Sequence, residues 1–168
     1  MNKLSYLKML NVNIICVGKI KESFFRDAIE EYSKRLNSYC SLNIIELKDE
    51  KIPNNPSEKD NQIIKEKEGS NILSHIKKDT YIICLDLKGK QYTSEEFSQK
   101  INNISNNISS SITFIIGGSL GISQNVLKKA NESISFSKMT FPHQLFRVIL
   151  LEQIYRAFKI MNNETYHK

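Results

Sequence analysis

The sequence predicts a single α/β domain built on one parallel sheet, and three observations lead to this prediction. Short apolar runs rich in β-branched residues alternate along the chain with longer segments of helical periodicity. The apolar runs are continuous, as expected for strands covered by helices on both faces. A length of 168 residues with 40% hydrophobic and 25% charged residues suits one core and is short for two domains.

The first half of the chain is expected to contain three strands and two helices. Ser57 follows the proline-containing loop KIPNNPS and can cap the second helix. The expected strands are 13–17, 41–47 and 80–87, and the expected helices are 22–36 and 57–76.

The second half continues the alternation. Thr93 and Glu96 have the spacing of a capping box, which predicts that a helix begins there. The longest apolar helix follows the segment TFPHQ and runs almost to the C-terminus. The other elements expected are a helix over 93–104, a strand over 111–116, a helix over 124–131 and a short strand over 133–137.

The composition sets bounds on partners and location. Twenty-four Lys and Arg against 18 Asp and Glu give a net charge of +6, which favours a polyanionic partner without requiring one. Cys16, Cys40 and Cys84 show no CxxC spacing, so they are expected to be reduced thiols of a cytoplasmic protein. No run approaches the ~18 apolar residues of a membrane span. Residues 1–9 are expected to be an N-terminal extension whose flexibility or absence costs the fold little.

A cluster of glycines follows the fourth strand. Gly117, Gly118 and Gly121 stand between a strand and a helix, where glycine allows a ligand to approach the backbone, although a tight turn explains them equally well. The GGxxG spacing is neither a P-loop nor GxGxxG, and the first strand is followed by only one glycine. The loops LDLKGK, GGSLG and SKMTFPHQ follow strands three to five and are expected to converge on one pocket, bordered by Leu85 and Gly117.

The loop FSKMTFPH is unusually apolar. It is expected either to pack beneath the last helix or to form an apolar pocket for adenine and a sulfonium group. Arg147, within LFRVILL, needs an anionic or carbonyl partner if buried, which leaves open a bound carboxylate or phosphate, a core salt bridge and a subunit contact. Glu152 and Arg156 are spaced as a solvated i,i+4 pair.

Histidines and the C-terminal tail complete the set of candidates. His75 lies in a polar helix and is expected to be an ordinary surface residue, whereas His143 begins the last helix beside the predicted pocket. The tail ETYHK has the composition of a frayed end, yet an aromatic ring, an imidazole and a cation also suit stacking on a base and polarising it.

These segments resemble a known family. FIIGGSLGIS, SFSKMTFPHQLFRVILLEQIYRAFKI and the terminal YHK are closely similar to the bacterial 23S rRNA pseudouridine N3-methyltransferases of the SPOUT superfamily, and the similarity extends from NIICVGKIKE to the last residue. The resemblance implies a SPOUT domain over 10–168, a homodimer, and a deep C-terminal trefoil knot. The knot and the cofactor loops would span about 85–168. It also implies that S-adenosylmethionine is held in the knot, with no metal.

The resemblance also implies site residues. Tyr166, His167 and Lys168 of one subunit would complete the RNA site beside the other subunit's cofactor. Many relatives end in a YHR-like sequence, so Lys168 keeps the charge and loses the bidentate fork. The implied cofactor contacts are Leu85, Gly117, Phe136, Ser137, Lys138, Met139, Thr140 and Phe141.

The implied reaction is attack of N3 of a pseudouridine in 23S rRNA on the S-methyl group, on assembled ribosomes. The proton acceptor stays open between the tail, His143 and bulk water. Arg147, which its position among apolar residues makes a catalytic candidate, and the Lys and Arg residues of helix 22–37 are candidate phosphate contacts. Two other functions compete: a non-catalytic RNA-binding factor, and a nucleotide-dependent oxidoreductase, which the missing first-strand fingerprint disfavours.

Overall fold

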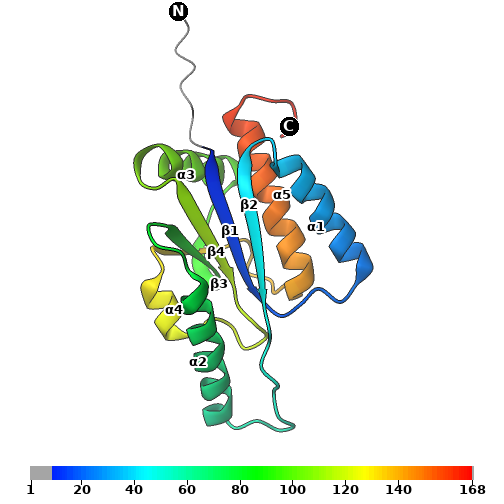
Figure 1. Cartoon of the computed structure of the whole chain (residues 1–168), viewed down its shortest axis with the longest axis vertical. Helices are drawn as coiled ribbons and strands as arrows, with labels where there is room; N and C mark the ends of the chain where they lie inside the picture. The colour runs from blue at the N-terminus through cyan, green and yellow to red at the C-terminus, as the bar shows by residue number, and fades with distance from the viewer. Residues whose placement is uncertain (1–8, 168) are drawn as a thin grey trace, which may run out of the picture.

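A computed structural model describes residues 9–167 and shows one five-stranded sheet in which every strand pair is parallel (Figure 1). The strand order is β2-β1-β4-β3-β5, so the last three strands of the chain stand side by side. Lys168 and residues 1–8 of the expected N-terminal extension lie outside the described residues. The predicted α/β class is confirmed. The strands are β1 (Leu10–Val17), β2 (Cys40–Leu47), β3 (Tyr81–Gln91), β4 (Ser111–Ile116) and β5 (Glu132–Ser135).

Helices cover both faces of this sheet (Figure 1). α1, α3 and α5 pack on one face, where they share a core with β1, β3, β4 and β5. α2 and α4 pack on the other face through Ile72 and Val126, next to Ile122 from the segment before α4. The helices are α1 (Ser23–Leu36), α2 (Glu58–His75), α3 (Ser94–Asn107), α4 (Gln124–Lys129) and α5 (His143–Met161).

Local sequence signals place the helix starts. Ser57 and Asp60 form a reciprocal capping box at the start of α2, and Thr93 and Glu96 form one at the start of α3. Ser123 caps α4 by accepting from the Val126 amide. Both predicted helix starts are confirmed. They could be predicted because each capping box depends only on residues three positions apart.

β3 differs from its prediction. The strand was expected to end at Leu87 and to release LDLKGK as a loop, but it continues to Gln91 with an irregularity in its pairing with β5. Both Leu85 and Lys90 align with Ile134, so the residues between them bulge out. A side chain at Gly89 would collide with the Ile134 backbone, its Cβ 2.5 Å from the carbonyl carbon. The β5 pairing that extends β3 is not visible in the local sequence.

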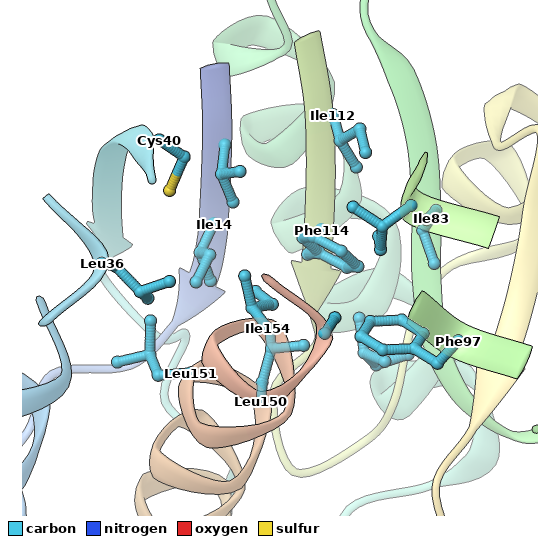
Figure 2. Close-up of a cluster of buried hydrophobic side chains, with 14 of the residues drawn as sticks. Ile14, Leu36, Cys40, Ile83, Phe97, Ile112, Phe114, Leu150, Leu151 and Ile154 are labelled. Atoms are coloured by element: carbon cyan, nitrogen blue, oxygen red, sulfur yellow. The ribbon is translucent and has the colours of Figure 1, made fainter. Parts of the chain in front are cut away.

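The larger core lies between the sheet and the α1, α3 and α5 layer (Figure 2). Phe114 from β4 lies among Ile14, Ile83, Phe97 and Ile154 in this view. Burial of these side chains stabilises the fold by roughly 1.5–3 kcal/mol each before entropy is counted. All three cysteines are buried free thiols. Over residues 9–167, no helix is long and apolar enough to cross a membrane.

Candidate functional site

A cavity of about 320 Å³, here called the loop cavity, opens beside the bulge of β3 and beyond the ends of β4 and β5. These strands are neighbours in the sheet, so their following segments meet at one edge. The predicted convergence of the three segments is confirmed. The volume lies in the range of small-molecule sites, which begins near 300 Å³.

Seven of the eight residues implied as cofactor contacts line the loop cavity. Lys138 does not line it and is exposed on the outside of its loop. The seven are Leu85, Gly117, Phe136, Ser137, Met139, Thr140 and Phe141. Asp86 and Ser119, which lie in two of the predicted loops, also line the cavity, and Phe146 of α5 lines it without having been predicted from the sequence.

The glycine segment forms a compact turn at the cavity wall. The Gly121 amide donates to the Gly118 carbonyl at 3.0 Å, and Gly121 has a φ of +86°, which favours glycine. A Cβ on Gly117 would lie 2.8 Å from Ile122 Cγ1 and 2.9 Å from the Gly121 carbonyl carbon. The predicted tight turn is therefore confirmed, and it borders a cavity, while the approach of a ligand to these glycines stays a prediction.

The segment after β5 forms the aromatic wall. Ser137 accepts from the Met139 amide at 2.9 Å, and this bond curves the chain outward. Phe141 stacks on Phe146 of α5 at 6.1 Å, and Phe136 meets the same ring edge-on at 5.4 Å. The apolar loop thus packs against the last helix and lines the cavity at once, which joins the two alternatives drawn from its composition.

The bulge of β3 forms another wall of the loop cavity. Asp86 accepts from the Lys88 amide at 2.7 Å, which holds a carboxylate at the cavity wall. Asp86 is half-buried, whereas Leu87 is 55% exposed. Among the described residues that line the loop cavity, Asp86 is the one with an acidic side chain.

Arg147 is engaged within its own chain. Its guanidinium bonds Glu46 Oε2 at 2.6 Å and donates to the Gly18 carbonyl at 2.5 Å and the Val17 carbonyl at 3.3 Å. The residue is 2% exposed. Of the roles left open by the sequence, the contacts support a core salt bridge that ties α5 to the ends of β1 and β2, and they do not support a catalytic role.

A second hollow of about 450 Å³, here called the side groove, adjoins the loop cavity. The two share Gly118, Ser119 and His143 as lining residues. Gln144, next to His143, accepts from the Lys21 amide at 2.8 Å and so ties the segment after β1 to the start of α5. The charged residues that line the groove are Lys19, Lys21, Asp49, Glu50, Lys51 and Arg147.

His143 therefore stands at the boundary of the two spaces. Burial, and then the positive charge of Arg147 one turn later in α5, lower the pKa of its imidazole below the usual 6.5. A lowered pKa keeps the ring neutral at neutral pH. No group within residues 9–167 hydrogen-bonds to this ring.

The tail lies elsewhere. Tyr166 donates to Glu152 at 3.1 Å, and His167 contacts Arg156 at 3.2 Å and Glu95 at 2.7 Å. The expected frayed end is therefore docked on α5 and α3. The Glu152–Arg156 pair was expected to be solvated, but its side chains are only 19% and 25% exposed because the tail covers them.

The docked tail does not reach the loop cavity of its own chain. Glu152 lies roughly 13 Å along the α5 axis from His143, at about 1.5 Å per residue. Neither Tyr166 nor His167 lines either hollow. Burial, followed by the bond to Glu152, raises the pKa of Tyr166 to about 12. In this position Tyr166 is a neutral donor.

Comparison with known proteins shows which family the chain is similar to. A family model described as "Predicted SPOUT methyltransferase" matches residues 10–167. The chain belongs to the SPOUT methyltransferase family. It is 64% identical over 159 residues to the ribosomal RNA large subunit methyltransferase H of Clostridium botulinum strain Hall, 63% to that of strain Kyoto and 61% to that of strain Eklund 17B. Each alignment covers 95% of this chain and all of the relative.

Membership makes the chain a methyltransferase and matches its parallel sheet. The competing function of a nucleotide-dependent oxidoreductase, which the sequence disfavoured, is thereby excluded. In residues 9–167 no group of three or more His, Cys, Asp or Glu side chains is arranged to hold a metal ion.

Proposed function

We propose that this protein transfers the methyl group of S-adenosylmethionine to N3 of a pseudouridine in 23S rRNA, on the assembled ribosome in the cytoplasm. The supporting observation is the loop cavity, formed by the three segments that the family resemblance implies for the cofactor. The relatives, 61–64% identical over their full length, carry the name of a ribosomal RNA large subunit methyltransferase.

The loop cavity suits the methyl donor. Adenine needs flat apolar walls and nearby backbone groups, which Phe136, Phe141 and the Gly117 turn offer. The Asp86 carboxylate at the wall can attract the donor's cationic groups. When bound, S-adenosylmethionine supplies an electrophilic methyl group, so the protein's contribution is to align the donor and the nucleophile.

The proposal includes a homodimer and a deep trefoil knot, both implied by the family. The position of the tail supports the dimer. Because Tyr166 and His167 dock on their own chain away from its loop cavity, a tail that completes an RNA site beside the cofactor belongs to a second subunit. Lys168, outside the described residues, forms part of the same proposed site.

Two binding measurements test this function against a non-catalytic RNA-binding factor. Calorimetry should show S-adenosylmethionine binding with a Kd in the micromolar range. Labelled donor should then transfer its methyl group to ribosomes from cells lacking the enzyme, and less to free rRNA. RNA affinity without donor binding would contradict the proposal and support the non-catalytic factor.

A further inference from the structure

The nucleotide to be methylated must lie directly beside the methyl donor. In-line displacement needs the nucleophile and the methyl carbon about 3 Å apart. If the donor occupies the loop cavity, the substrate must enter a space that shares a wall with it. The side groove is such a space, since Gly118, Ser119 and His143 line both.

The side groove has the charges and size for a nucleotide. Its volume of about 450 Å³ exceeds that of the loop cavity, and Lys19, Lys21 and Lys51 are exposed at it. Phosphate contacts of this kind position a nucleic acid without reading its sequence. Of the two acidic residues of the groove, Glu50 is paired with Lys67 at 2.8 Å.

His143 is the imidazole on the shared wall. Because its ring is neutral and makes no hydrogen bond within residues 9–167, a ring nitrogen is available to accept a proton. The charged groups around it are Arg147 on α5 with its partner Glu46, Lys19 and Lys21 after β1, Asp49, Glu50 and Lys51 after β2, and Asp86 and Lys88 in β3. Tyr166 and His167 of the same chain face Glu152 and Glu95 instead of this ring.

We propose that the target nucleotide occupies the side groove and that His143 is the catalytic residue that accepts the proton of the ring nitrogen being methylated. This inference rests on the proposed function. The imidazole takes the N–H proton, the nitrogen lone pair forms the new N–C bond to the methyl carbon, and the C–S bond breaks with its electron pair going to sulfur. The sulfonium becomes a neutral thioether, and the imidazolium later releases its proton to water.

His143→Gln tests this role, with His75→Gln as the matched control. His75 is exposed at the end of α2 and lines neither hollow. We expect His143→Gln to lower kcat by on the order of 10²-fold or more, the range of general base catalysis, while donor affinity and thermal stability are retained. His75→Gln should match the wild type in all three.

The pH profile separates a proton acceptor from a structural residue. For the wild type, kcat should rise through a pKa below 6.5 and then level off, because the lowered pKa leaves the imidazole free above it. In His143→Gln that limb should vanish, leaving a rate that climbs with pH as the nitrogen ionises unaided. Added imidazole should partly restore kcat in His143→Ala.

Three other outcomes would separate this inference from the proposed function. An unchanged kcat and pH profile in His143→Gln would overturn this inference while leaving the proposed function intact. Loss of donor affinity in that variant would also overturn it, since His143 would then serve only as part of the donor's wall. Absence of methyl transfer by the wild type would instead refute the proposed function.

Discussion

Residues that the sequence assigns to one site lie at the two ends of α5, and the structure places the two groups differently. At the start of the helix, His143 and Phe146 face the loop cavity, beside backbone turns and aromatic rings that pack within one chain. At the other end, Tyr166 and His167 fold back onto Glu152, Arg156 and Glu95, away from the cavity. One chain thus builds the proposed donor site by itself. Its tail, in the position seen here, can complete only the site of another chain; to reach the cavity of its own chain it would have to detach from α5 and α3.

The bonds at each end explain this difference. The start of α5 is fixed by Arg147, whose buried guanidinium joins Glu46 and two backbone carbonyls. The tail is held by hydrogen bonds between partly exposed side chains, which contribute about 1 kcal/mol or less each, and by the Tyr166 ring, which packs on Tyr155 and Arg156. The start of α5 is thus anchored by a buried group, whereas the tail is anchored at the surface.

Of the three changes that test this contrast, removal of Tyr166–Lys168 should have the largest effect on activity. If the tail positions the base, its loss should lower kcat by on the order of 10²-fold, while donor affinity stays within about twofold of the wild type. Single-turnover methylation and calorimetry measure the two quantities. Full activity of the truncated protein would show that the tail is not part of the site, and the two ends of α5 would then not differ in the way described.

The same truncation shows whether the tail acts in its own chain or in its partner. Tail-deleted chains, which keep an intact loop cavity, are mixed with Gly117→Val chains, which keep an intact tail. Mixed dimers should recover activity only if a tail serves the partner's cavity. No recovery in dimers verified by mass would indicate that tail and cavity act within one chain.

Arg147→Met sharpens the account of the helix start. Removing the guanidinium takes one donor from each of two carbonyls and leaves Glu46, which is 37% exposed, with the Ile20 amide, so the free energy of unfolding should fall by about 1.5–3 kcal/mol, the range for a hydrogen bond to a charged group. Urea denaturation of Arg147→Met, Glu46→Gln and the double variant measures the coupling. Unchanged stability with a raised KM for RNA would instead favour the phosphate contact that the sequence left open.

Gly117→Val should have the smallest effect of the three. The added Cβ meets Ile122 and the backbone of Gly121 below 3 Å, so the turn must shift. We expect donor affinity to fall by roughly tenfold to a hundredfold, from about 1–3 kcal/mol of overpacking. Ile108→Ala is the control, because Ile108 is 58% exposed after α3 and lines neither the loop cavity nor the side groove. Unchanged donor affinity in Gly117→Val would move the donor away from this turn.

Much of this fold could be predicted from local sequence. The strand and helix alternation follows from periodicity, and the capping boxes at Ser57 and Thr93 depend on residues three positions apart. The strand order could not be predicted in this way. The continuation of β3 past Leu87 likewise depends on pairing with β5, far along the chain.

The site shows the same division. Position after neighbouring strands located Leu85, Gly117 and Phe136 near one cavity, and the resemblance supplied their proposed role. Arg147 could be recognised as buried, but its partner Glu46 lies on another strand. The tail was expected to fray because its composition is polar, and its dock on Glu152 and Glu95 depends on tertiary packing.

Mapping the methylated nucleotide tests the central claim most directly. The purified protein is incubated with isotopically labelled S-adenosylmethionine and ribosomes from cells lacking the enzyme, and the rRNA is digested and analysed by mass spectrometry. The account predicts one labelled methyl group, on N3 of a pseudouridine in 23S rRNA. Label on another atom or in another RNA, or no label with active protein and intact ribosomes, would contradict it.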